Sequence, residues 1–269
     1  MRQPAQAQQA HMRDSLHAEW TKLRTAPGTI WLLLAIIGLT VVLSAAAADA
    51  VTCPTVGCAE DPAKVSLTGI QLGQALVAIL AVLAISGEYS TGMIRITVTA
   101  MPRRATVLAA KAAILTCIVV TAATIAVLAS VLAGRLILPG HGFTPAHGYP
   151  LLSLGDGPVL RAAAGSVLYL TLIALLSLGT ATAVRDSGTA IGIVLGLLYL
   201  FPIIASVVSD PSWQQHLKQI GPMPAGLAIQ ATTNLRDLPI GPWAGLGVLA
   251  AWTAAALLTG GLLLRLRDT

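Results

Sequence analysis

The charged residues with the most informative spacing lie in one segment between two apolar stretches. The segment contains Glu88, Tyr89, Gly92 and Arg95, followed by Pro102, Arg103, Arg104 and Lys111. Ser90 or Thr91 can cap a short helix over residues 92–100, and Pro102 stops that helix or starts the next one. Because the segment has no catalytic group, we expect it to act through charge and position. The alternative is an ordinary charged connector.

Motifs for familiar enzyme chemistry are absent from the sequence. It has no GxxxxGK[ST], so the chain lacks a phosphate-binding loop for ATP. It also has no HExxH and no GxSxG, which excludes the usual zinc protease and serine hydrolase sites. We therefore expect no enzyme activity and no cofactor in this chain. Energy for any transport has to come from another subunit.

Two glutamines offer polar contacts within an apolar stretch. Gln71 and Gln74 lie on adjacent faces of a predicted helix. Either they contact a substrate in a central cavity, or they form hydrogen bonds between helices. Small residues at four-residue spacing, Gly188, Gly192 and Gly196, indicate a seam for close helix packing within the chain or across a dimer, unless they reflect composition alone.

Cysteine and histidine are too sparse for a metal centre. Cys53 and Cys58 share a loop, where they form either a disulfide or two free thiols. Cys117 lies alone in an apolar stretch. His141 and His147 lie in a loop rich in Gly and Pro, and a metal site needs more ligands than these two. No metal site is predicted.

The composition defines the environment of these residues. Of 269 residues, 55% are hydrophobic and 10% are charged, and the mean hydropathy is +0.79. Soluble domains carry about 25% charged residues, so this chain cannot cover a water-facing surface. Six apolar stretches reach the length of about 20 residues that crosses a bilayer as helix. They cover residues 30–48, 67–86, 112–134, 162–184, 188–208 and 243–264, and none contains Asp, Glu, Lys, Arg or His. The predicted fold is an all-α polytopic membrane protein.

The basic residues predict the orientation of the six spans. Of 16 Lys and Arg residues, 11 lie in the tail 1–29, the segment 87–111, the turn at Arg185 and the C-terminus 265–269. Because cytoplasmic segments carry the excess of Lys and Arg, both termini are predicted to be cytoplasmic. The formal charge of +5 lacks the dense basic patch with aromatics that nucleic-acid binding needs, so no nucleic-acid partner is expected.

Segments outside the spans also have a predicted form. Met12, Leu16, Trp20 and Leu23 recur at helical spacing, with Lys22 among the polar residues between them. This pattern predicts an amphipathic helix in the interface with membrane lipid, or else a disordered tail. Residues 135–161 are expected to be irregular. Residues 209–242 are expected to contain a helix capped by Asp210, then a short interfacial or re-entrant helix over 225–231.

Two segments of this sequence resemble those of a known family. The series His17–Ala18–Glu19–Trp20–Thr21–Lys22–Leu23–Arg24 resembles the start of many bacterial type-2 ABC permeases. The series Glu88–Tyr89–Ser90–Thr91–Gly92–Met93–Ile94–Arg95, with Pro102–Arg103–Arg104 and Lys111, is similar to the loop between their second and third spans. The six-span layout agrees with that resemblance over nearly the whole chain.

The resemblance implies a function for the chain. It implies a permease subunit in a bacterial cell membrane that pairs with a second permease and with two ABC ATPase subunits, which hold the ATP and Mg. The loop at residues 88–104 would be the helix that couples to the ATPase. The apolar spans favour export of an apolar or amphipathic substrate, such as a drug-like molecule, peptide or lipid. The alternative is a membrane scaffold or sensor without transport activity. A third hypothesis, an intramembrane enzyme, has no polar catalytic groups to support it.

Overall fold

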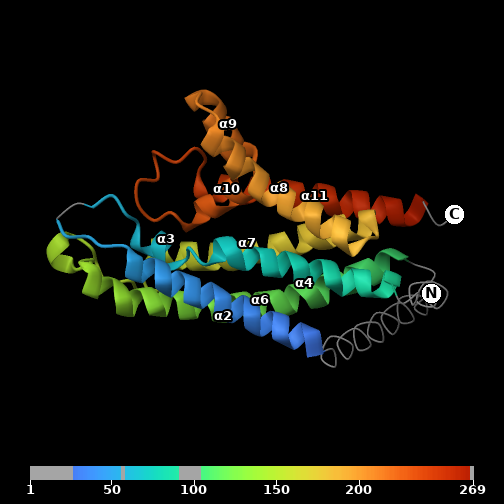
Figure 1. The fold of residues 1–269 in the computed structure, drawn as a ribbon, viewed down its shortest axis with the longest axis horizontal. Helices are drawn as coiled ribbons and strands as arrows, with labels where there is room; N and C mark the ends of the chain where they lie inside the picture. Colours follow the sequence, from blue (N-terminus) through green and yellow to red (C-terminus); the bar gives the residue numbers. More distant parts are fainter. Residues whose placement is uncertain (1–26, 56–57, 91–103, 267–269) are drawn as a thin grey trace, which may run out of the picture.

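The computed structural model describes residues 27–55, 58–90 and 104–266. These residues form helices and no strands. Six long helices run back and forth between two ends of the molecule, so that consecutive long helices point in opposite directions (Figure 1). They are α2 (Pro27–Ala50), α4 (Ile70–Ser90), α6 (Arg104–Ile137), α7 (Gly157–Val184), α8 (Ser187–Val207) and α11 (Pro242–Leu266).

Short helices fill the connections. They are α3 (Pro62–Ser66), the 3-10 turns η1 (Leu138–His141) and η2 (Pro145–His147), α9 (Pro211–Ile220), α10 (Pro222–Leu227) and the 3-10 turn η3 (Ala228–Gln230). All of them lie at one end of the molecule (Figure 1). We call this the disulfide end, because its loops contain Cys53 and Cys58. The opposite end, where Arg185 and Asp186 join α7 to α8, is called the hairpin end.

Among the described residues, five helices are long and apolar enough to cross a membrane. Their apolar parts span Gly28–Ala50, Leu108–His141, Gly157–Val184, Ser187–Val207 and Pro242–Leu264. They match five of the six predicted spans. The sixth, predicted over 67–86, corresponds to α4, whose described apolar part, Ile70–Ile85, is shorter. The fold is therefore all-helical with five candidate spans.

The start of α4 differs from the predicted boundary for a local reason. The predicted span began at residue 67, whereas residues 67–69 form a turn after α3. Asp61 caps α3, and Pro62 occupies its first turn, where a missing N–H costs nothing. The Asp61–Pro62 dipeptide thus starts a separate short helix before α4.

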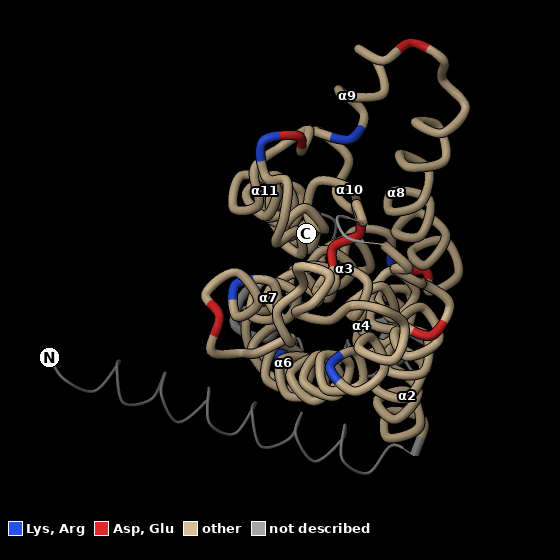
Figure 2. Tube along the Cα trace, turned by 90° about the vertical axis from the view of Figure 1, so that its left-hand side faces the viewer, with Lys and Arg blue, Asp and Glu red and all other residues tan. Residues whose placement is uncertain are grey.

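The helices pack in two layers, and α7 touches both. Viewed along the bundle, α2, α4, α6 and α7 lie together, while α8 and α11 lie to one side of them (Figure 2). Helix α7 packs against α4, α6, α8 and α11. Its most apolar part is 61% buried, compared with 17% to 39% in the other candidate spans. The core of the described chain therefore surrounds α7.

Small residues make the central position of α7 feasible. A Cβ atom at Gly165 would overlap the Ile229 side chain, and one at Gly179 would lie 2.6 Å from the backbone of Ala256 and Leu257. Such contacts let helix backbones approach closely. Buried hydroxyl groups on α7 donate to their own helix, as from Ser177 to the Ile173 carbonyl at 2.7 Å.

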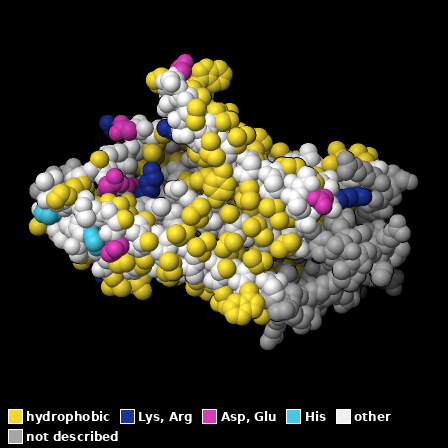
Figure 3. Space-filling model, viewed as in Figure 1, with side chains coloured by type: hydrophobic (Ala, Val, Ile, Leu, Met, Phe, Trp, Pro, Cys, Tyr) yellow, Lys and Arg dark blue, Asp and Glu magenta, His cyan; other side chains and the backbone are white. Residues whose placement is uncertain are grey.

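The outward faces of the other helices are apolar. Exposed side chains on α2, α6, α8 and α11 include Trp31, Leu132, Ile203 and Leu258. On the face seen in Figure 3, hydrophobic side chains gather over the middle of the bundle, and charged side chains lie toward its ends. In water such a surface would drive association, whereas hydrocarbon accepts it without a penalty.

Candidate functional site

Two tyrosines and two glutamines join α4, α7 and α8. The Tyr169 hydroxyl on α7 donates to Gln74 Oε1 on α4, and both side chains are fully buried. Gln74 Nε2 donates to the Gln71 carbonyl at 2.9 Å, and the Tyr199 hydroxyl on α8 donates to the same carbonyl at 2.6 Å. A buried polar group without partners destabilises the fold, so this network fixes the relative positions of the three helices.

The two predicted substrate-contacting glutamines therefore differ in position. Gln74 lies inside the helix contact, which corresponds to the interhelical alternative. Gln71 instead lines a cavity of about 690 Å³ at the disulfide end. The cavity is bounded by α3, α4, α8, α9, α10 and the loop before α11. Its volume is in the range of small-molecule sites.

The carboxylate of Asp61 holds two segments together beside this cavity. It accepts hydrogen bonds from the Ala63 and Lys64 amides at the start of α3. It also accepts from the Thr232 amide and hydroxyl and from the Thr233 amide at 3.0 Å. Asp61 is only 8% exposed, so these donors replace its water shell. The loop after η3 is thereby fixed to the start of α3.

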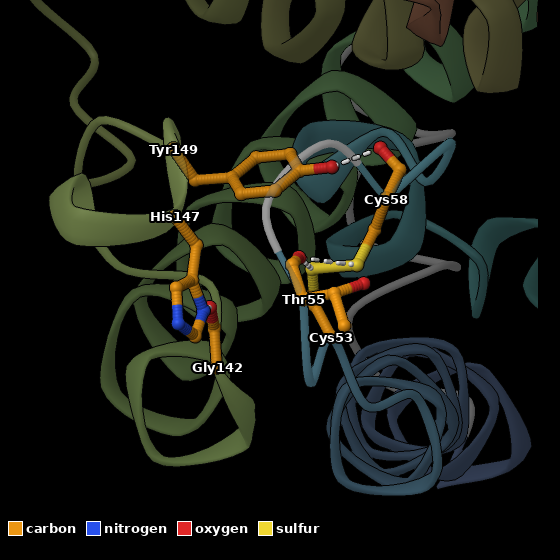
Figure 4. Close-up of a disulfide and its surroundings, with 6 residues drawn as sticks. All are labelled: Cys53, Thr55, Cys58, Gly142, His147 and Tyr149. Atoms are coloured by element: carbon orange, nitrogen blue, oxygen red, sulfur yellow. Dashed lines mark hydrogen bonds between the residues drawn. A yellow bond between two sulfur atoms is a disulfide. The ribbon is translucent and has the colours of Figure 1, made fainter.

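Cys53 and Cys58 form a disulfide in the loop after α2 (Figure 4). The Cys53 amide donates to the His141 carbonyl at 2.8 Å, and the Tyr149 hydroxyl donates to the Cys58 carbonyl. Gly142 has a φ of +94°, and a Cβ atom there would overlap the Cys53 carbonyl oxygen. The disulfide loop is therefore docked onto the loop that follows α6.

Each histidine near this loop has one hydrogen-bonding partner of its own. His141 Nε2 lies 3.1 Å from an Asp49 carboxylate oxygen, and His147 Nδ1 lies 2.7 Å from the Gly142 carbonyl. No group of three or more His, Cys, Asp or Glu side chains able to hold a metal occurs within the described ranges. These histidines serve loop packing.

The predicted coupling residues fall at the hairpin end or outside the described residues. The backbone of Glu88 and Tyr89 belongs to the last turn of α4, and Arg104 is the first residue of α6. Gly92, Arg95, Pro102 and Arg103 lie outside the described residues, as do Trp20 and Lys22 of the predicted interfacial helix. Lys111, the last basic residue of this series, is only 6% exposed on α6.

The glycine just before α4 and the predicted glycine stripe on α8 have different surroundings. Gly69 packs against α2, where a Cβ atom would overlap the Thr40 carbonyl oxygen. A Cβ atom at Gly192 or Gly196 would meet no described atom within 4 Å. The stripe on α8 is therefore exposed and forms no seam with the described part of the chain.

Sequence reasoning missed several residues that organise the disulfide end. Asp61, Tyr169 and Tyr199 were not singled out as tertiary partners. The Asp61–Pro62 dipeptide was a usable signal, because Asp before Pro is typical of a helix start. The two tyrosines carry no local signal, since their partners lie 95 and 128 residues away.

A scan against protein-family models and a search of curated proteins find no match to this chain. The fold itself defines the class. The part of the chain that the structure describes is all-helical, and five of its helices can cross a membrane and have apolar outward faces. The chain therefore has the make-up of a multi-pass membrane protein.

Proposed function

We propose that this chain is the permease subunit of an ATP-driven ABC exporter in a bacterial cell membrane. One observation carries the proposal. The alternating helices bring the end of α4 and the start of α6 to the hairpin end, and in the sequence the charged segment 88–104 joins these two helices. A force applied to that segment acts on both helices.

The absence of an internal energy source supports this proposal. The six predicted spans contain no Asp, Glu, Lys, Arg or His, whereas ion-driven carriers place such groups within the membrane. The sequence also lacks a phosphate-binding loop. A separate ABC ATPase subunit, with its own ATP and Mg, would supply the energy through the residues 88–104.

The proposed assembly contains a second permease, either an identical copy or a close relative. The exposed stripe of Gly188, Gly192 and Gly196 on α8 offers a surface on which another helix can approach closely. The substrate path would run between the two permeases. Its apolar surroundings favour an apolar or amphipathic substrate.

The proposal includes six spans, with α4 as the second, and cytoplasmic termini. The excess of Lys and Arg in the sequence segments 1–29, 87–111 and 265–269 and at Arg185 supports this orientation. Engineered cysteines in a Cys117→Ala background test it. An impermeant thiol reagent applied to cells should label Gln215→Cys at the disulfide end but not Arg104→Cys. External labelling at Arg104→Cys would reverse the orientation.

The proposed coupling is tested by changing charge at residues 88–104. We expect the Glu88→Ala/Arg95→Ala double variant to lose ATPase binding or to hydrolyse ATP without export. Truncating one partner of an interfacial charge pair typically costs about 2 to 5 kcal/mol, because the other charge is left unpaired. The measurement is a pull-down of the co-encoded ATPase, with an export assay on the same variants.

A matched control removes one charge of each sign at the opposite end. Arg236 and Asp237 are exposed in the loop before α11, and their double alanine variant should assemble and export normally. Wild-type assembly and export by the Glu88/Arg95 variant would refute the coupling assignment. If no ATPase co-purifies with the unmodified chain, the scaffold or sensor alternative replaces the permease.

A further inference from the structure

The cavity at the disulfide end has a polar part and an apolar part. Its polar lining consists of Lys64, Gln71, Ser206, Gln214 and Lys218. The apolar lining comes mainly from α8, α10 and the loop before α11, and includes Pro202, Met223, Leu227 and Ile240. In the space-filling view the molecule is hollowed beneath α9, with Lys or Arg side chains at the edge of the hollow (Figure 3).

The charged lining of this cavity is entirely cationic. Lys64 and Lys218 line it, and no Asp or Glu does. Asp61, the acid beside Lys64, already accepts hydrogen bonds from α3 and from Thr232 and Thr233. Neither lysine forms an ion pair with any residue in the described ranges. The two ammonium groups are therefore available to an anion.

The side-chain amide of Gln71 is also available. Its backbone carbonyl accepts from Gln74 and Tyr199, while its side chain makes no hydrogen bond to the described residues. An amide NH₂ can donate two hydrogen bonds to an anion. Gln71 thus adds a neutral donor to the two cations.

Helix α9 turns its polar side toward the cavity. Gln214 and Lys218 line the cavity, while Trp213 and Ile220 are 64% and 52% exposed. Gln214 is held in place by its donation to the Val208 carbonyl at 2.7 Å. A water-exposed helix would place its apolar side chains inward. Helix α9 has the reverse orientation, so its polar donors face the cavity, and the opposite wall of the cavity is apolar.

We propose that this cavity binds an anionic amphiphile. Lys64, Lys218 and the Gln71 amide would hold its phosphate, sulfate or carboxylate head, and the side chains of α8 and α10 would contact its apolar part. An apolar pocket with a few convergent polar groups is the usual form of a ligand site. The assignment as transported substrate rests on the proposed function, whereas the binding itself does not.

Binding to the purified full chain in a neutral detergent tests this site. The probes are dihexanoyl phosphatidylglycerol, the chain-matched phosphatidylcholine, and inorganic phosphate, with Kd measured by native mass spectrometry. We expect phosphatidylglycerol to bind, phosphatidylcholine to bind far more weakly, and phosphate not to displace the lipid at equal concentration. This pattern separates an anionic headgroup on a lipid from a free anion.

The variant Lys64→Gln/Lys218→Gln should raise the phosphatidylglycerol Kd by about 30-fold, from the loss of two favourable charges. Both side chains are exposed and make no described hydrogen bond, and an unchanged thermal midpoint would verify folding. Lys64→Arg/Lys218→Arg should retain binding. The matched control, Arg135→Gln/Arg236→Gln, removes two exposed charges at the same end outside this cavity, and should leave the Kd nearly unchanged.

Three results would overturn the site. The first is that Lys64→Gln/Lys218→Gln and Arg135→Gln/Arg236→Gln weaken phosphatidylglycerol binding equally. The second is equal binding of phosphatidylglycerol and phosphatidylcholine, and the third is displacement of phosphatidylglycerol by phosphate at equal concentration. None of these measurements involves the ATPase. Failure of the amphiphile site is therefore distinguishable from failure of the permease assignment, which the pull-down at residues 88–104 decides.

Discussion

The disulfide end and the hairpin end of the molecule are built differently. At the disulfide end, side chains bridge segments far apart in sequence, as Asp61 does with Thr232 and Thr233. Those contacts cross 171 and 172 residues. At the hairpin end, the connection between α7 and α8 is local. Arg185 takes the left-handed conformation, and Asp186 caps α8 through the Thr189 amide.

This difference shows how the two ends reach stable loops. Long loops need tertiary bonds to offset the entropy of ordering them, and the disulfide end supplies these through Asp61, the disulfide and Tyr149. A two-residue turn needs only a cap and one residue at positive φ. The disulfide end thus has the fixed walls that a binding cavity requires, and the proposed partner contact lies at the other end.

The largest predicted effect tests whether the two ends are packed equally well. Helix α11 approaches α10 at Gly245, where a Cβ atom would overlap the Ala225 carbonyl oxygen. It approaches α7 at Gly179, where a Cβ atom would lie 2.6 Å from the Ala256 backbone. Since neither neighbour is a flexible side chain, Gly245→Leu and Gly179→Leu should each lower stability by about 3 kcal/mol or more. The measurement is the thermal unfolding midpoint in neutral detergent.

The control for these variants is Gly247→Leu on α11, because no described atom would lie within 4 Å of its Cβ. It should unfold like the unmodified chain. If Gly179→Leu is tolerated while Gly245→Leu is not, the helices are packed more loosely at the hairpin end. The two ends would then differ in helix packing as well as in loop structure.

A smaller effect is expected from Asp61→Ala. This change removes a buried acceptor of five hydrogen bonds from α3 and the loop after η3. Bonds to a charged group typically contribute about 1.5 to 3 kcal/mol, and water will satisfy part of the loss. We expect destabilisation of about 2 kcal/mol and faster hydrogen exchange at the Thr232 and Thr233 amides. Asp237→Ala, an exposed acid in the following loop, is the control. Unchanged exchange would mean that the carboxylate does not hold this loop.

The smallest effect concerns a structure found at both ends, a helix cap formed by an exposed aspartate. The pKa of Asp186 lies below its ordinary 3.8, mainly because the Thr189 amide donates to the carboxylate. The pKa of Asp210 is likewise lowered, mainly by hydrogen bonds from Ser212. A lowered pKa means that each cap is complete above the ordinary value and is lost as pH falls through the folded-state value.

The measurement is hydrogen exchange at the Thr189 and Ser212 amides, expressed as a protection factor that corrects for the intrinsic exchange rate. Both protection factors should decline as the pH falls. In the Asp186→Asn and Asp210→Asn variants the amide oxygen of Asn can still accept the capping hydrogen bond, but it does not titrate. The protection factors of these variants should therefore not decline in acid. Persistence of the decline in either Asn variant would assign it to another group.

The local elements of the fold were accessible from sequence because their causes are local. The prediction of a helix capped by Asp210 is confirmed by α9, since Asp210, Pro211 and the apolar spacing are all adjacent. The tight turn at Arg185 is confirmed for the same reason. The cavity was not accessible, because its two lysines are 154 positions apart in the chain and no local pattern relates them.

Gln71 and Gln74 mark the boundary between what the sequence determined and what the tertiary structure decided. The sequence by itself determined that the chain forms long apolar helices and that these two amides lie among them, because length and hydropathy are properties of each segment alone. It left open whether either amide faces a neighbouring helix or a cavity. Only the packing of α7 and α8 against α4 decided that Gln74 bonds to Tyr169 and Gln71 lines the cavity. The physical reason is that helix rotation is set by the side chains of partner helices, which local periodicity does not contain.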